Sequence, residues 1–226
     1  MEAGVKTVHI AFPQYGNNAF AEVVSEYLNG TFGGVDDVHP KLASLLFAGD
    51  RFASKSILLE AIQSNSLVIC DRYIASNLAH QAAKLPTEQR SSFMDWLHRI
   101  EFGIYGMPKP DLTIYLDVPV DTARKMVDKK PARDQFDLFG EETQGAYTTL
   151  KQDIHEQNAS YLANCRELYD YLIEQNIAGP WERISCLSSD GQTLRPAPEI
   201  SLDVWNAVRV DLLKSGTESG AGHAVS

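Results

Sequence analysis

The chain has 226 residues, 44% of them hydrophobic, and a formal net charge of −10. This length favours a single domain with one buried core, and the acidic balance argues against a nucleic-acid partner, whose binding surfaces are basic. No uninterrupted apolar run reaches the roughly 18 residues that a membrane helix needs, so we expect no membrane partner.

The cysteines indicate the compartment. Cys70, Cys165 and Cys186 form no C-x-x-C pair, which argues against a disulfide framework or a zinc ribbon. The first residues also lack the charged-then-apolar layout of a signal peptide. We therefore expect a cytoplasmic protein.

Strand and helix patterns alternate along the chain. Short β-branched runs at 5–12, 66–71, 112–118 and 182–187 predict buried parallel strands. Helical spacing covers 19–28, 39–63, 87–102, 121–127, about 145–175 and 201–213. This alternation predicts an α/β fold, a doubly wound parallel sheet with helices on both faces.

The domain prediction follows from the same pattern. We expect one domain over residues 1–214, with a charged, mobile lid at about 128–152. The small-residue stretch 215–226 is typical of a flexible tail.

The stretch FPQYG, residues 12–16, follows the first predicted strand. Ligands of open α/β sheets bind beyond the carboxyl ends of strands, which makes this a candidate binding loop containing Phe12 and Tyr15. The alternative is a simple strand-to-helix turn, because proline and glycine interrupt many chains.

Phe47 and Arg51 lie four residues apart on a predicted helix and therefore share a face. A ring and a guanidinium on one face could stack on a flat base and donate to its carbonyl. The alternative is a core aromatic residue beside a surface Arg–Asp pair.

Asp71-Arg72-Tyr73 closes the second predicted strand. The planar guanidinium of Arg72 suits bidentate phosphate contact, and Asp71 could reach a magnesium ion directly or through water. Ser76 and Asn77 then predict a helix cap, whose dipole end favours an anion. A structural salt bridge with a helix cap is the alternative.

Five stretches, taken in order, resemble motifs of the thymidylate kinase (dTMP kinase) family, which has the P-loop nucleoside monophosphate kinase fold. They are FPQYG, LLFAGDRF, DRYIASNLAHQ, PKPDLTIYLDVP and KQDIHEQNASYL, spread from about residue 5 to 187. The resemblance implies transfer of the γ-phosphoryl group of ATP to dTMP, giving dTDP for dTTP biosynthesis, with Mg²⁺ as cofactor.

The resemblance also implies roles in nucleotide binding. Phe47 would stack on thymine, Arg51 would donate to a thymine carbonyl, and Asn77 with Gln81 would reach the other base edge. Tyr73 would pack against the deoxyribose and disfavour a 2′-hydroxyl. Phe12 and Tyr15 would line the same pocket.

The phosphates would meet a second set of residues. Arg72 would grip the monophosphate of dTMP or a related pyrimidine monophosphate, with Asp71 near the water shell of Mg²⁺. Lys129, Arg133 and Lys151 would serve as lid cations, Lys129 and Arg133 toward ATP. A solvated charged loop is the alternative for this segment. By analogy we also expect a homodimer, formed through helices 19–28 and 87–102.

The sequence departs from the family pattern in two places. Relatives have a strand, a GxxxxGK[ST] loop and a helix before the FPxY strand, whereas that strand begins here four residues after Met1, and Gln152 stands where relatives have arginine. We expect roughly 30 residues of a βαβ unit to be missing, a gap between the strands ending at Asp71 and Asp117, and no turnover by this chain alone. The alternative is an inactive relative that binds dTMP as part of an assembly.

Overall fold

The computed structural model describes residues 5–34, 36–119, 122, 159–191 and 193–218. All four predicted strands are confirmed, with ends shifted by at most two residues. They are β1 (Thr7–Ala11), β2 (Leu67–Asp71), β3 (Thr113–Asp117) and β4 (Trp181–Ser185).

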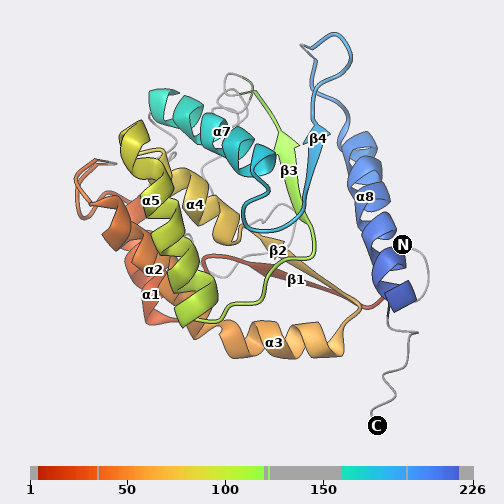
Figure 1. The fold of residues 1–226 in the computed structure, drawn as a ribbon, viewed down its shortest axis with the longest axis horizontal. Helices are drawn as coiled ribbons and strands as arrows, with labels where there is room; N and C mark the ends of the chain where they lie inside the picture. The colour runs from red at the N-terminus through yellow and green to blue at the C-terminus, as the bar shows by residue number, and fades with distance from the viewer. Residues whose placement is uncertain (1–4, 35, 120–121, 123–158, 192, 219–226) are drawn as a thin grey trace.

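The strands form two separate parallel pairs. β1 pairs with β2, with Ala11 opposite Asp71, and β3 pairs with β4, with Asp117 opposite Ser185. Among the described residues β2 and β3 do not pair with each other, which confirms the expected gap between the strands ending at Asp71 and Asp117. In Figure 1 the two pairs lie in the middle of the molecule.

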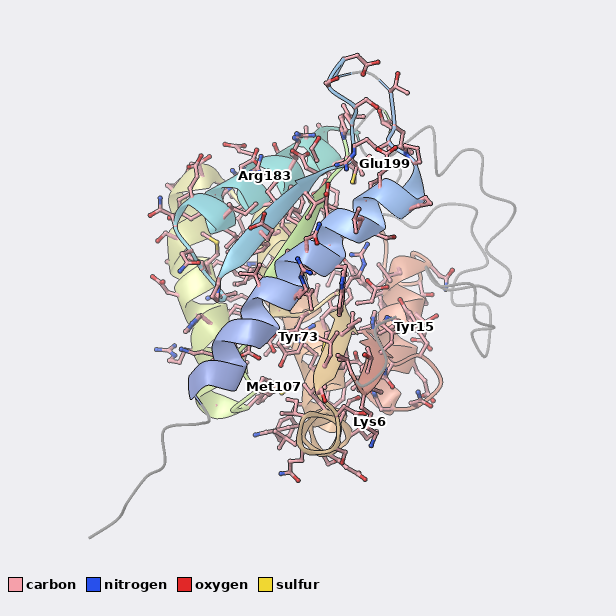
Figure 2. All side chains as sticks on the ribbon, turned by 90° about the vertical axis from the view of Figure 1, so that its right-hand side faces the viewer. Lys6, Tyr15, Tyr73, Met107, Arg183 and Glu199 are labelled. Atoms are coloured by element: carbon pink, nitrogen blue, oxygen red, sulfur yellow. The ribbon has the colours of Figure 1, made fainter. Side chains whose placement is uncertain are left out.

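Helices cover the strands from both sides, as the α/β prediction requires. In Figure 1 α4, α5 and α7 lie on one side of the strands and α8 on the other, while Figure 2 shows α8 crossing in front of them. The helical segments are α1 (Ala19–Leu28), α2 (Pro40–Ala53), α3 (Lys55–Ser64), α4 (Ile74–Ala82), α5 (Thr87–His98), the π-helical turn η1 (Arg99–Ile104), α7 (Ala159–Glu174) and α8 (Ala197–Glu218).

Two predicted helices are wrong as single elements. The segment 39–63 breaks at Ser54, where α2 ends and α3 begins in a new direction, and the N–H of Ser54 donates to the carbonyls of Asp50 and Arg51 at 3.1 and 3.2 Å. The segment 87–102 changes to a wider turn after His98, and the N–H of Tyr105 donates to the carbonyl of Ile100, five residues back, at 2.8 Å.

Other boundaries also differ from the prediction. α4 begins at Ile74, so Ser76 and Asn77 lie inside the helix and do not cap it. α8 starts before 201 and continues to Glu218, so the first residues of the predicted tail 215–226 are helical. The predicted helix 121–127 and the predicted lid fall almost wholly outside the described residues.

The main core lies between the first strand pair and the helices. Ile10 of β1 packs with side chains of α4, α5 and α7, including Ile74, Leu78, Leu97 and Leu172, which are at most 8% exposed. Their burial explains the helical spacing of apolar residues in these segments. The core fixes α4 beside the carboxyl end of β2.

Gly179 joins α7 to β4 at a close approach between segments. Its φ is +110°, and an added Cβ would lie 2.9 Å from the carbonyl oxygen of Pro110. We expect Gly179→Ala to lower the free energy of unfolding by about 2–4 kcal/mol, because backbone strain and overpacking add. Urea unfolding measures the change. Gly191→Ala is the matched control, since Gly191 has φ +68° and no atom within 4 Å of its added Cβ. Equal losses in the two variants would contradict the steric account.

Candidate functional site

The loop after β1 is tied to two other segments. The N–H of Phe12 donates to the carbonyl of Asp71 at 2.9 Å, so the ends of β1 and β2 stay together. The buried carboxylate of Asp50 on α2 accepts from the N–H of Gln14 at 3.1 Å and from Nδ2 of Asn18 at 2.7 Å. Burial raises the pKa of Asp50, and these two donors oppose that shift. The loop is therefore fixed against α2.

The two aromatic residues of this loop lie in different places. Phe12 is 4% exposed and belongs to the main core, with its ring 5.9 Å from that of Tyr73. Tyr15 packs against the cluster of Val24 and Tyr27, which Phe47 also contacts. Tyr15 and Phe47 thus pack against one cluster, while Phe12 lies in the main core.

Phe47 and Arg51 lie on α2, as predicted. Phe47 is half-buried and meets Tyr27 edge to face at 6.3 Å. Arg51 is only 3% exposed, and its Nε and Nη2 both donate to the carboxylate of Glu101 on η1, the Nε bond being 3.1 Å long. The alternative of a surface Arg–Asp pair is therefore wrong, because Arg51 is buried and its partner is a glutamate 50 positions away.

Asn77 and Gln81 lie one turn apart on α4 and are 4% and 1% exposed. Nδ2 of Asn77 donates to the carbonyl of Ser44 at 3.0 Å and to Glu101 at 3.2 Å. Within the described part of the chain, Oδ1 of Asn77 and Oε1 of Gln81 have no hydrogen-bond partner. Buried acceptors of this kind normally find a donor, so both oxygens are candidates for ligand contact.

Arg72 stands at the turn from β2 to α4. Its φ is 56°, a left-handed conformation that costs a non-glycine residue energy and that often occurs at functional sites. Its side chain is exposed, and Nη1 donates to Oγ of Ser76 at 3.3 Å. The backbone thus presents the guanidinium beyond the strand end, where a phosphate would meet it.

Asp71, the last residue of β2, places a carboxylate at this turn. Mg²⁺ is usually held by one or two carboxylates together with waters and substrate phosphates, so Asp71 beside a bound phosphate fits that ion. No group of three or more histidine, cysteine or acidic side chains forms a metal cluster within the described ranges.

Tyr73 occupies a more buried place than the sequence indicated. Its hydroxyl donates to the carbonyl of Pro108 at 2.9 Å, and its ring packs on Phe12. Burial raises the pKa of Tyr73. The hydroxyl thus fastens α4 to the segment before β3, and its contact with a deoxyribose stays a prediction.

His80 is a residue that the sequence analysis missed. On α4 its Nδ1 lies 3.0 Å from the hydroxyl of Tyr161 and 3.6 Å from Sγ of Cys165, both on α7. Burial, together with the nearby cations Arg72 and Lys84, lowers the pKa of His80 to about 3. The neutral ring therefore joins α4 to α7.

This burial predicts a specific acid sensitivity. In the unfolded chain His80 binds a proton below its ordinary pKa of 6.5. In the folded protein the ring stays neutral until the pH falls to about 3. The contribution of His80 to the free energy of unfolding is therefore fully present above pH 6.5. Below that pH it falls by about 1.4 kcal/mol for each pH unit, because the unfolded ring is then protonated and the folded ring is not. Urea unfolding at several pH values should show a shallower acid loss for His80→Gln. His98→Gln, which changes an exposed histidine on α5, should retain the steep loss.

The sequence analysis also missed two buried acidic residues, Glu101 and Asp50. Both are 0% exposed and hold candidate site segments in place. Glu101 does carry a local signal, since it continues the buried face of Phe93 and Leu97 at four-residue spacing. An acidic residue on an apolar face predicts a buried cation partner.

Three predicted cations cannot be placed. Lys129, Arg133 and Lys151 lie outside the described residues, as does Gln152. No helix within the described ranges has the length and apolarity to cross a membrane.

Comparison with known proteins points to one family. A family model described as Thymidylate kinase matches residues 1–176. A thymidylate kinase of Mycobacterium tuberculosis (strain H37Rv) is 34% identical over 179 residues, covering 79% of this chain and 77% of that protein. A probable thymidylate kinase of Pyrococcus horikoshii is 38% identical over 99 residues, 43% of this chain and 44% of that one.

A solved structure supports the same fold. The thymidylate kinase from Candida albicans superposes with a TM-score of 0.58 and covers 91% of this chain and 80% of its own, at 18% identity. At this identity the likeness establishes the fold alone. The alternative of an inactive nucleotide-binding relative finds no support in these comparisons.

Proposed function

The chain belongs to the thymidylate kinase family, and from this premise we propose that it binds dTMP and transfers the γ-phosphoryl group of ATP to it, giving dTDP. The observation that carries the proposal is the meeting of α2, α4 and η1. There a half-buried ring, a guanidinium and two amide oxygens that no described residue engages lie on facing elements.

We propose that these groups recognise the base. Phe47 would stack on the thymine ring, and Nη1 of Arg51, which no described residue engages, would donate to a ring carbonyl. The free amide oxygens of Asn77 and Gln81 would accept from the base edge. Tyr15 would close the pocket beside Phe47 and Tyr73 would lie toward the sugar, with Phe12 beneath.

The phosphate end would use the turn after β2. Arg72 would hold the dTMP phosphate bidentately, which places one phosphate oxygen in line with the γ-phosphorus of ATP. The new P–O bond forms as the bond to the β-phosphate oxygen breaks, so ADP leaves with that electron pair. Mg²⁺ near Asp71 would neutralise charge on the phosphates, and Lys129, Arg133 and Lys151 are proposed as cations for ATP and the transferring group.

The oligomeric state and the cellular location are also part of the proposal. By analogy with the family we propose a homodimer acting in the cytoplasm in dTTP synthesis. Light scattering on the purified chain would test the dimer, and a monomer at all concentrations would contradict it.

The test of this function is a coupled assay of dTDP formation from dTMP, ATP and Mg²⁺. It should be run on the purified protein. We expect dTDP and ADP in equal amounts, and no dTDP when thymidine, which has no acceptor phosphate, replaces dTMP. Absence of dTDP formation from dTMP would contradict the proposal.

A further inference from the structure

Glu101 is the centre of a buried polar network that joins three elements. Its carboxylate is fully buried on η1 and accepts from Nε and Nη2 of Arg51 on α2 and from Nδ2 of Asn77 on α4. Arg51 and Asn77 lie within the motifs that the sequence shares with the family, whereas Glu101 does not. Each bond that Glu101 accepts fixes a residue proposed to meet the base.

The network determines which atoms of Asn77 remain free. Nδ2 faces two groups that can only accept, the backbone carbonyl of Ser44 at 3.0 Å and the carboxylate of Glu101 at 3.2 Å. A rotated amide would bring Oδ1 against both oxygens, which is repulsive. Both amide protons of Asn77 therefore point toward Ser44 and Glu101. Its Oδ1 is left buried without a partner among the described residues.

The same network determines the free atoms of Arg51. Its two bonds to Glu101 use Nε and Nη2 and leave Nη1 as a donor. The site thus offers one donor from Arg51 beside one acceptor from Asn77. Thymine and uracil present the complement, a carbonyl oxygen next to a ring N–H, whereas cytosine presents an amino group next to an unprotonated ring nitrogen.

We propose that Glu101 is a positioning residue that sets this donor–acceptor polarity and so makes the site select pyrimidines with a ring N–H over cytosine. This inference rests on the proposed function, since it assumes that a pyrimidine monophosphate occupies the site. Glu101 acts through Arg51 and Asn77 and does not touch the base. The selected class includes both dTMP and dUMP.

The experiment compares the dissociation constants of dTMP and dCMP by calorimetry in wild type and in two variants. Glu101→Asp keeps the charge for Arg51 but withdraws the carboxylate by one methylene from Asn77, and Glu101→Gln keeps the length but loses the charge. We expect the dTMP preference over dCMP to fall at least about 10-fold in each variant that folds, chiefly through weaker dTMP binding. Glu101→Asp preserves the test if Glu101→Gln does not fold.

Leu97→Ala is the matched control, because Leu97 is fully buried one turn before Glu101 and has no part in the polar network. It should lower the melting temperature and leave the dTMP:dCMP ratio unchanged. An unchanged ratio in folded Glu101 variants, or an equal fall in Leu97→Ala, would overturn the inference while the function stands. Wild-type protein that binds neither nucleotide would overturn the proposed function itself and this inference with it.

Discussion

Arg72→Ala is expected to weaken dTMP binding at least about 100-fold, because a bidentate, charge-assisted contact to phosphate is lost. Thymidine, which has no phosphate, should bind the variant as it binds wild type. The affinity advantage of dTMP over thymidine therefore measures the contribution of Arg72. Calorimetric titration with the two ligands gives this difference without any need for turnover.

Two further variants separate charge from backbone effects. Arg72→Gly should lose the same dTMP affinity but be at least as stable as Arg72→Ala, because glycine adopts the φ of 56° without strain. Arg209→Ala removes an exposed arginine on α8 and should leave both affinities unchanged. An equal loss for dTMP and thymidine in Arg72→Ala would show that Arg72 does not contact the phosphate.

The position of Arg72 at the end of a strand could be predicted from the sequence, because the pattern that places it there spans only a few neighbouring residues. An apolar β-branched run ends at Asp71, and a polar residue follows at the carboxyl edge of a parallel strand. Strand pattern and strand-end chemistry both act over a few residues, so the four strands and the loop positions after β1 and β2 were predictable. The left-handed φ of Arg72 was not, since no glycine or asparagine marks it.

The separation of the strand pairs was predictable through the family's fold, whereas the helix break at Ser54 was not. Apolar spacing continues across that position, and the break depends on α2 and α3 packing against different elements. The start of α4 was missed for a related reason, because its first flanking residue, Tyr73, makes no side-chain cap bond. Tertiary packing decides such boundaries.

The pairing of Arg51 with Glu101 could not be read from any local pattern, although the buried face at Glu101 carried a local signal for a cation partner. Arg51 and Glu101 are 50 residues apart, and Asp50 reaches Gln14 and Asn18 over more than 30. The sequence showed which side chains could meet a base but not which buried carboxylates hold them.

Glu101→Ala is expected to lower the free energy of unfolding by about 3–5 kcal/mol, because it leaves the buried guanidinium of Arg51 without a counter-charge. Asn77 also loses one acceptor. Urea unfolding with linear extrapolation measures the change. Glu167→Ala is the control, since the side chain of Glu167 is 70% exposed and pairs with Arg90 at 3.5 Å, and an ion pair with an exposed partner contributes only about 0–1 kcal/mol.

Replacing both partners of the buried pair tests the origin of that loss. Arg51→Met/Glu101→Leu removes both charges together, and such a swap should cost less than about 2 kcal/mol, most of it from the unmet donor of Asn77. The double variant should therefore be more stable than Glu101→Ala. Losses of the single variants that simply add in the double variant would mean that Arg51 and Glu101 are not energetically coupled, contrary to this account.

The double variant also separates stability from recognition. It should remain folded and yet bind dTMP poorly, because it has no guanidinium to meet the base carbonyl and no carboxylate to orient Asn77. A hydrophobic pair would then hold α2 against η1 about as well as the charged pair does. The buried charges would be explained by nucleotide selection, since folding alone does not require them.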